Sequence, residues 1–102
     1  MATAEPPPIP SAVAAALGAL PGALAAAGYV ATEVNTSECF GNFAVAYVGP
    51  RGNIQIARDR GQFIVSGLPR EELESFGLWR TFSGARDLES PLGLWLNAAN
   101  EA

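Results

Sequence analysis

The stretch from Phe40 to Leu68 constrains the fold of this chain most, because it holds three short apolar runs separated by two glycine turns. Along the first run, residues 42–48, aromatic and valine side chains alternate with smaller ones, the period of two that is typical of a strand. Two further runs follow at residues 53–58 and 62–68. Three strands joined by short turns predict an antiparallel β-meander.

Both turns contain residues whose backbone preferences favour hairpins. Gly49-Pro50-Arg51-Gly52 has proline at its second position and glycine at its fourth, which favours a type I turn. Asp59-Arg60-Gly61 suits a three-residue connection in which two right-handed residues precede a left-handed glycine that closes a bulge. We therefore expect two consecutive hairpins.

The segment before the meander predicts a helix with a weak apolar stripe. Ser11 occupies the expected N-cap position, and Gly28 the expected stop. Pro21 predicts a kink or a restart as a second short helix, because proline cannot donate a backbone N–H. A strand over residues 29–34 and a turn over residues 35–38 complete the link. The apolar residues on one helical face are Val13, Leu17, Leu20 and Leu24.

The segment after the meander predicts two further helices. Pro69 suits a first helical position, and a short helix with Leu73 and Phe76 facing the core would end at Gly77. Ser90-Pro91 predicts the start of a terminal helix that frays at Asn100. Between them, residues 78–82 fit an edge strand or a helical turn.

Together these elements predict an α+β fold in two layers. An antiparallel meander of about four strands would pack against an N-terminal helix and a C-terminal helix. Residues 1–10 contain four prolines and predict a flexible arm, whereas residues 11–102 predict a single domain.

Charge and composition indicate which classes of partner and which cellular compartment suit this chain. Ten acidic residues against six arginines, with no lysine, give a formal charge of −4, which disfavours nucleic acid and anionic membranes and favours a basic protein partner. The single cysteine, Cys39, excludes an intrachain disulfide and predicts a small buried thiol in a cytoplasmic protein. Residues 12–32 carry no charge, but their alanine, glycine and proline content argues against a membrane span or a signal peptide.

The residue types present also argue against catalysis. The chain has no histidine to serve as a base or metal ligand, and no glycine-rich phosphate loop, so we expect no enzyme activity, cofactor or metal. Structural roles explain the acidic groups that could pair: helix-start electrostatics, helix capping and turn formation. These groups are Glu71 with Glu74, Asp87 with Glu89, and Asp59.

The two tryptophans of the chain, and two arginines at the second hairpin turn, are further candidates for binding. Trp79 and Trp95 suit a core or an interface, and core use is the stronger expectation in a chain with few large side chains. Arg58 and Arg60 can pair bidentately with carboxylates, either within the domain or on a partner.

Two short motifs resemble a group of small bacterial proteins. These are Phe40-Gly41-Asn42-Phe43 at a strand entry and Arg58-Asp59-Arg60-Gly61-Gln62-Phe63 at a hairpin, and the likeness covers about residues 12–68. Some members of this group are similar to the immunity proteins of polymorphic or contact-dependent bacterial toxin systems. The resemblance implies a small α+β protein that binds a toxin.

The resemblance and the acidic balance together predict a cytoplasmic, non-catalytic immunity protein that neutralises a cognate toxin by direct binding. The alternative is a secretion chaperone or adaptor, which would hold an effector segment at a sheet edge. Such a protein could act as a homodimer. A small carboxylate-dependent hydrolase is a further alternative. The candidate partner-binding residues are Glu33, Glu38, Asp59, Arg60, Glu71, Glu72, Glu74 and Trp79.

Overall fold

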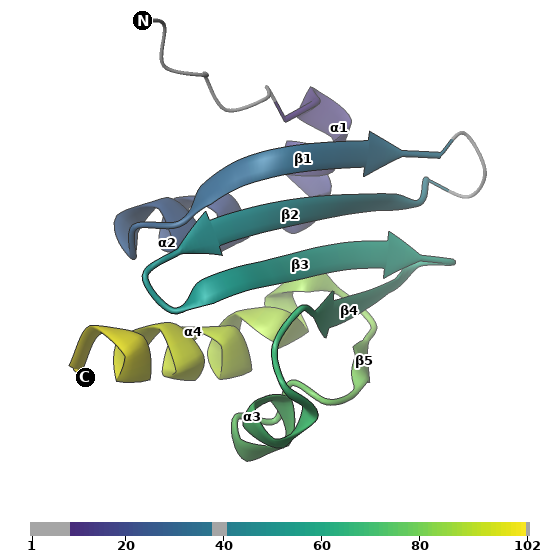
Figure 1. Cartoon of the computed structure of the whole chain (residues 1–102). Coiled ribbons are helices and arrows are strands. Elements are labelled where there is room, and N and C mark those ends of the chain that lie inside the picture. Colours follow the sequence, from purple (N-terminus) through teal and green to yellow (C-terminus); the bar gives the residue numbers. More distant parts are fainter. Residues whose placement is uncertain (1–8, 38–40, 102) are drawn as a thin grey trace, which may run out of the picture.

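The computed structural model of the chain describes residues 9–37 and 41–101, which form a two-layer α+β fold (Figure 1). Five antiparallel strands pair in chain order into one sheet: β1 (Val30–Thr36), β2 (Phe43–Gly49), β3 (Gly52–Asp59), β4 (Gln62–Ser66) and β5 (Thr81–Phe82). The described residues also form four helices: α1 (Ser11–Leu17), α2 (Leu20–Ala26), α3 (Arg70–Ser75) and α4 (Ala85–Glu101). The predicted fold class is confirmed, with five strands where about four were expected.

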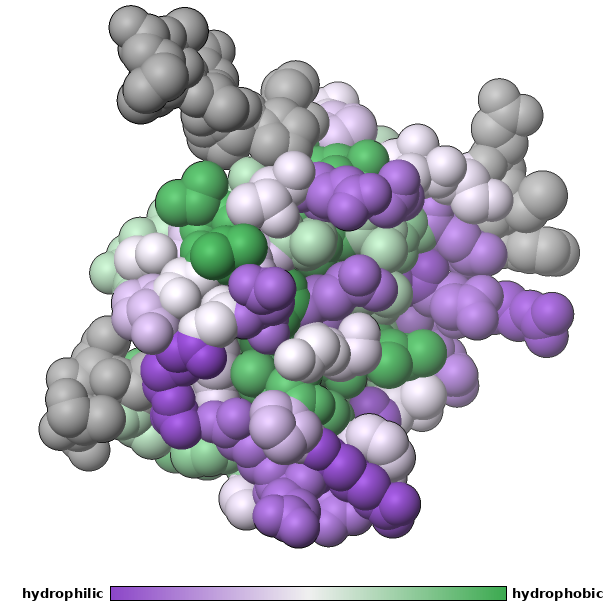
Figure 2. Space-filling view, in the orientation of Figure 1, coloured by the Kyte–Doolittle hydropathy of each residue, from purple (hydrophilic) through white to green (hydrophobic). Residues whose placement is uncertain are grey.

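The helices cover one face of the sheet and leave the other open. Figure 1 shows α1, α2 and α4 behind the strands. Figure 2 shows hydrophobic and hydrophilic side chains interspersed on the open face, where the paired Val30 and Val48 are about half exposed. The residues buried between the layers form one cluster that includes Leu17, Leu20, Leu24, Val45, Ile54, Ile56, Leu88, Leu92 and Trp95.

At the N-terminus, Pro21 restarts the helix rather than kinking it. Pro21 lies in the first turn of α2, where its missing N–H needs no partner. Gly28 ends α2 with a φ of 89°, and Tyr29 N donates to the Leu24 carbonyl, so the last turn closes in a Schellman motif as the glycine predicts. The expected N-cap is wrong by one residue, because Ser11 is already helical and Pro10 occupies the cap without a side-chain hydrogen bond.

The linking segments differ from expectation at two places. Of the predicted arm, residues 1–8 lie outside the described part, and Ile9 packs against the core. The turn predicted at residues 35–38 begins too early, since Asn35 and Thr36 extend β1 by pairing with β2. Glu38 and Cys39 lie outside the described residues, so the predicted burial of the thiol stays a prediction.

The first hairpin turn is compatible with the predicted type I geometry, and the second differs from expectation. Pro50 and Arg51 have negative φ angles, as a type I turn requires, and Gly52 has a φ of 113°. In the second hairpin, Arg60 and Gly61 have φ angles of 53° and 81° and link the paired Asp59 and Gln62. Positive φ at both central residues identifies a two-residue type I′ turn, a type that suits the twist of paired strands. The predicted three-residue bulge is therefore wrong.

The C-terminal region contains the largest difference from expectation. Residues 81–82 form the edge strand β5, which resolves the ambiguity left at residues 78–82. Helix α4 begins at Ala85, so Pro91 lies inside the helix instead of starting it. The physical reason is tertiary packing, since Leu88 on the N-terminal side of the proline is as fully buried as Leu92 and Trp95 beyond it.

Candidate partner-binding surface

Among the described residues, Trp79 is the large aromatic side chain that the fold leaves on the surface. It is 51% exposed, whereas Trp95 is fully buried, so the expectation of core use is right for Trp95 and wrong for Trp79. The reason lies in the end of α3. Gly77 has a φ of 72° there and Leu78 N donates to the Leu73 carbonyl, so this Schellman turn buries Leu78 and leaves the next residue outside.

Two arginines lie near Trp79, Arg70 through a contact in space and Arg80 as the next residue in the chain. The guanidinium carbon of Arg70 lies 4.8 Å from the centre of a Trp79 ring, and its Nε lies 2.8 Å from Oε1 of Glu74. The carboxylate, one helical turn later on α3, therefore holds the guanidinium in place over the indole. On the following residue, Arg80, the guanidinium carbon lies 4.8 Å from the centre of the Phe82 ring.

An apolar hollow adjoins Trp79 because β5 is only two residues long. Strand β4 pairs with β5 at Phe63 and Ile64 and has no β5 partner at Val65 and Ser66. The space left there measures about 350 Å³. Its lining residues are Ile64, Val65, Ser66, Leu78, Trp79, Arg80 and Thr81. We call the hollow together with Arg70, Glu74, Trp79 and Arg80 the Trp79 surface.

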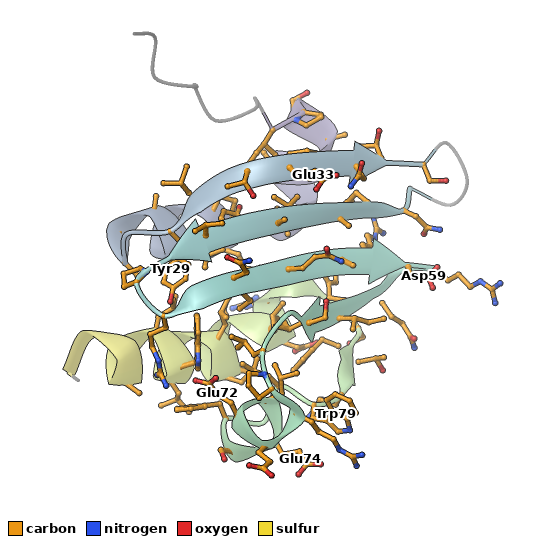
Figure 3. All side chains as sticks on the ribbon, viewed as in Figure 1. Tyr29, Glu33, Asp59, Glu72, Glu74 and Trp79 are labelled. Carbon is orange, nitrogen blue, oxygen red and sulfur yellow. The ribbon has the colours of Figure 1, made fainter. Side chains whose placement is uncertain are left out.

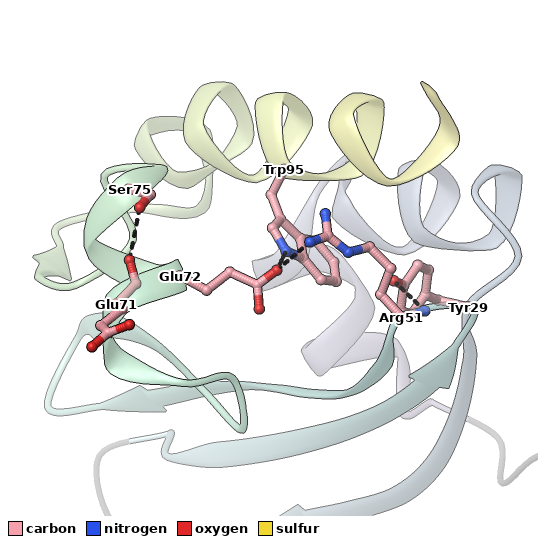
Figure 4. Close-up of polar contacts among 6 residues, drawn as sticks. All are labelled: Tyr29, Arg51, Glu71, Glu72, Ser75 and Trp95. Atoms are coloured by element: carbon pink, nitrogen blue, oxygen red, sulfur yellow. Dashed lines mark hydrogen bonds and ion pairs between the residues drawn. The ribbon is translucent and has the colours of Figure 1, made fainter. Parts of the chain in front are cut away.

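Of the acidic candidates on α3, Glu72 turns inward (Figure 4). Its Oε1 lies 2.6 Å from Nη2 of Arg51 and accepts a hydrogen bond of 3.0 Å from Nε1 of Trp95. The Glu72 carboxylate therefore has internal partners and serves the fold. By contrast, the Glu71 and Glu74 side chains are exposed.

Glu33, Asp59 and Arg60 lie away from the Trp79 surface (Figure 3), and Glu38 lies outside the described residues. Glu33 is exposed on β1, at the opposite edge of the sheet from β5, and accepts a hydrogen bond of 3.2 Å from Asn35. Asp59 and Arg60 lie at the β3–β4 hairpin tip, where Arg60 N donates to the Asn42 side chain. The structure thus brings Glu74 and Trp79 together and separates them from Glu33 and Asp59.

Sequence reasoning missed Arg70 and Arg80, although Arg70 had a detectable signal. Its spacing of four residues from Glu74 is that of an ion pair on a helix. Nothing in the sequence indicated that Arg80 would border a hollow, because that hollow depends on where β5 ends.

Within residues 9–37 and 41–101, no three His, Cys, Asp or Glu side chains are grouped to hold a metal ion. No helix in this part of the chain has the length and apolarity needed to cross a membrane. Comparison with protein-family models, curated proteins and solved structures finds no match to the chain.

Proposed function

We propose that this protein is a non-catalytic binding module whose Trp79 surface contacts a protein partner. The observation that carries the proposal is the 51% exposure of Trp79 beside an apolar hollow and two arginines. Tryptophan and arginine are the residues most enriched at the centres of protein interfaces. The Arg70–Glu74 ion pair limits the motion of the guanidinium over the indole, which lowers the entropy lost on binding.

The partner that fits best is a bacterial toxin, and the protein would act as its immunity protein in the cytoplasm. Support comes from the resemblance of residues 12–68 and from the formal charge of −4, which would attract a basic active-site rim. Near Trp79 the exposed Glu71 and Glu74 are balanced by Arg70 and Arg80. The net negative charge, to which Glu33 and Asp59 contribute, would therefore attract a basic partner from a distance. The Trp79 surface would supply the specific contacts.

Two matched substitutions test this proposal. Trp79→Ala and Leu94→Ala each remove a large exposed apolar side chain, since Leu94 is 60% exposed on α4. Each variant would be co-expressed with the product of the neighbouring gene, and growth rescue and the dissociation constant would be measured. We expect Trp79→Ala to weaken binding about 30-fold or more and to reduce rescue, since an interface hot spot costs about 2 kcal/mol or more. Leu94→Ala should bind within about threefold of wild type, because residues outside an interface hot spot contribute little to affinity.

The proposal has two clear ways to fail. Absence of both growth rescue and a complex on gel filtration would count against the immunity role. Equal binding by Trp79→Ala and wild type would remove Trp79 from the interface even if a complex forms.

One observation favours the alternative of a secretion chaperone or adaptor. β1 is a seven-residue edge strand, which could pair with an extended effector segment. A register shift between Ala31 and Glu33 and the exposed Glu33 side chain interrupt that edge, and both features oppose strand addition. A homodimer on gel filtration that retains a nonglobular effector peptide would favour this alternative.

A further inference from the structure

Arg58 occupies an unusual place on the helix-covered face of the sheet. A row of residues pairs across all five strands there: Thr36, Phe43, Arg58, Phe63 and Phe82. The two preceding residues of β3 on the same face, Ile54 and Ile56, are buried. Along β3, the cationic side chain of Arg58 therefore follows two buried isoleucines on the same face, at the end of the core.

The Arg58 guanidinium has no acceptor within the described part of the chain. Its Nε is buried and makes no hydrogen bond. The ion pairs of the described residues join Arg51 to Glu72 and Arg70 to Glu74, and neither includes Arg58. A buried donor without an acceptor costs free energy, so the Arg58 Nε–H is available to an acceptor that the described residues do not supply.

The surroundings of Arg58 provide room for such an acceptor. A hollow of about 250 Å³ lies between the start of α1 and the ends of β1 and β2, and Arg58 is part of its wall. Pro10, Ala12, Val13 and Phe43 supply its apolar side, and Thr36 and Asn42 add polar groups. On another side, the guanidinium carbon lies 5.9 Å from the centre of the Phe63 ring.

We propose that Arg58 and this hollow bind a small organic carboxylate with an apolar body. A guanidinium matches a carboxylate with two parallel hydrogen bonds, and one arginine balances its single charge. Val13 and Phe43 would contact the apolar body of the ligand. A phosphate fits less well, because its higher charge needs several cationic donors, and Arg58 is the one cation among the described residues that line the hollow. The site uses no residue of the Trp79 surface and is independent of the function proposed above.

Binding of benzoate to the full-length chain tests the site, with benzamide as a neutral ligand of similar shape and inorganic phosphate as an unrelated anion. We expect benzoate to bind in titration calorimetry and to raise the melting temperature, and both controls to bind at least tenfold more weakly. Arg58→Met keeps an unbranched side chain and should lower benzoate affinity at least tenfold. Arg60→Met removes the same charge at the exposed hairpin tip and should leave affinity within twofold.

Several results of these binding measurements would overturn the proposal. Equal binding of benzamide would show that the charge is irrelevant, and equal binding of phosphate would show a general anion effect. Unchanged affinity in Arg58→Met, or an equal loss in Arg60→Met, would exclude the site. If Arg58→Met does not fold, the Nε–Hε NMR signal of Arg58 in the wild-type protein, identified by its loss in Arg58→Lys, must shift with benzoate. A signal that stays in place overturns the proposal.

Discussion

Single residues show where the fold accepts a local cost, and Tyr47 is the clearest case. Its side chain is 3% exposed, and its hydroxyl is buried without a hydrogen-bond partner in the described structure. Burial raises the pKa of the Tyr47 hydroxyl above its ordinary value of 10.0, because the phenolate would lose its hydration. The ring packs in the core, so this residue contributes apolar contact and the hydroxyl opposes stability.

Replacing Tyr47 with phenylalanine should therefore stabilise the protein by about 1 kcal/mol, because it removes an unsatisfied buried hydroxyl. The raised pKa also means that the native state keeps its proton at a pH where the unfolded chain loses it. Stability is unaffected by this group below about pH 10 and falls as pH rises through the folded-state pKa, and Tyr47→Phe should reduce that fall. Urea denaturation at pH values on both sides of 10 measures both effects.

Tyr29→Phe is the control for this prediction, because the Tyr29 hydroxyl accepts a hydrogen bond of 3.4 Å from Arg51 N. The control should be neutral or slightly destabilising. A Tyr47→Phe protein that is less stable than wild type at neutral pH would show that the hydroxyl has a partner in solution.

At the scale of elements, the β3–β4 hairpin combines a favourable turn with an unfavourable residue. A type I′ turn needs positive φ at both central positions, and Gly61 adopts this conformation at little cost. Arg60 is the residue other than glycine that has positive φ in the described chain. Its backbone N–H donates to Oδ1 of Asn42 at 2.8 Å, a contact that helps to hold the tip in place.

Arg60→Asn should stabilise the hairpin by about 0.5 to 1 kcal/mol, because asparagine tolerates the left-handed conformation better and keeps the backbone N–H. Arg60→Val is the opposing control and should be destabilising, since a β-branched residue strongly disfavours positive φ. Chemical denaturation of the two variants gives the comparison. Equal stabilities would contradict the type I′ assignment.

Across the whole molecule, Glu72 connects parts that are distant in the sequence. From α3 it reaches Arg51 in the β2–β3 turn and the indole N–H of Trp95 on α4, and the Arg51 guanidinium lies over the Trp95 ring at 5.8 Å (Figure 4). The Trp95 ring in turn lies 5.4 Å from that of Tyr29. A single carboxylate thus joins the C-terminal helices to the sheet.

Glu72→Ala should lower the free energy of unfolding by about 2 kcal/mol, because it leaves the Trp95 N–H without an acceptor and Arg51 without a counter-charge. Glu72→Gln keeps an acceptor and should cost about half as much. Glu74→Ala is the matched control on the same helix, and loss of its exposed ion pair with Arg70 should cost about 0.5 kcal/mol or less. Thermal and urea denaturation would measure all three, and equal losses for Glu72→Ala and Glu74→Ala would contradict this role.

Much of the fold was predictable because the relevant preferences are local. Proline at residue 21 and glycine at residues 28 and 77 restrict the backbone by their own covalent structure, and each ends or restarts a helix as expected. The period-two alternation likewise predicted the strands of the meander. Of the candidate site, the sequence offered Trp79 and Glu74 as candidates for binding but grouped them with acidic residues that lie elsewhere, such as Glu33 and Asp59 (Figure 3).

By itself, then, the sequence determined the α+β class, the meander and the C-terminal ends of α2 and α3, where each residue acts through its own backbone. Tertiary structure alone decided which tryptophan is buried, which glutamate turns inward, where α4 begins and that the described residues leave the Arg58 Nε–H without an acceptor. These outcomes depend on neighbours supplied by distant segments. Burial, ion pairing and desolvation are properties of the assembled surroundings, which a residue's position in the chain does not contain.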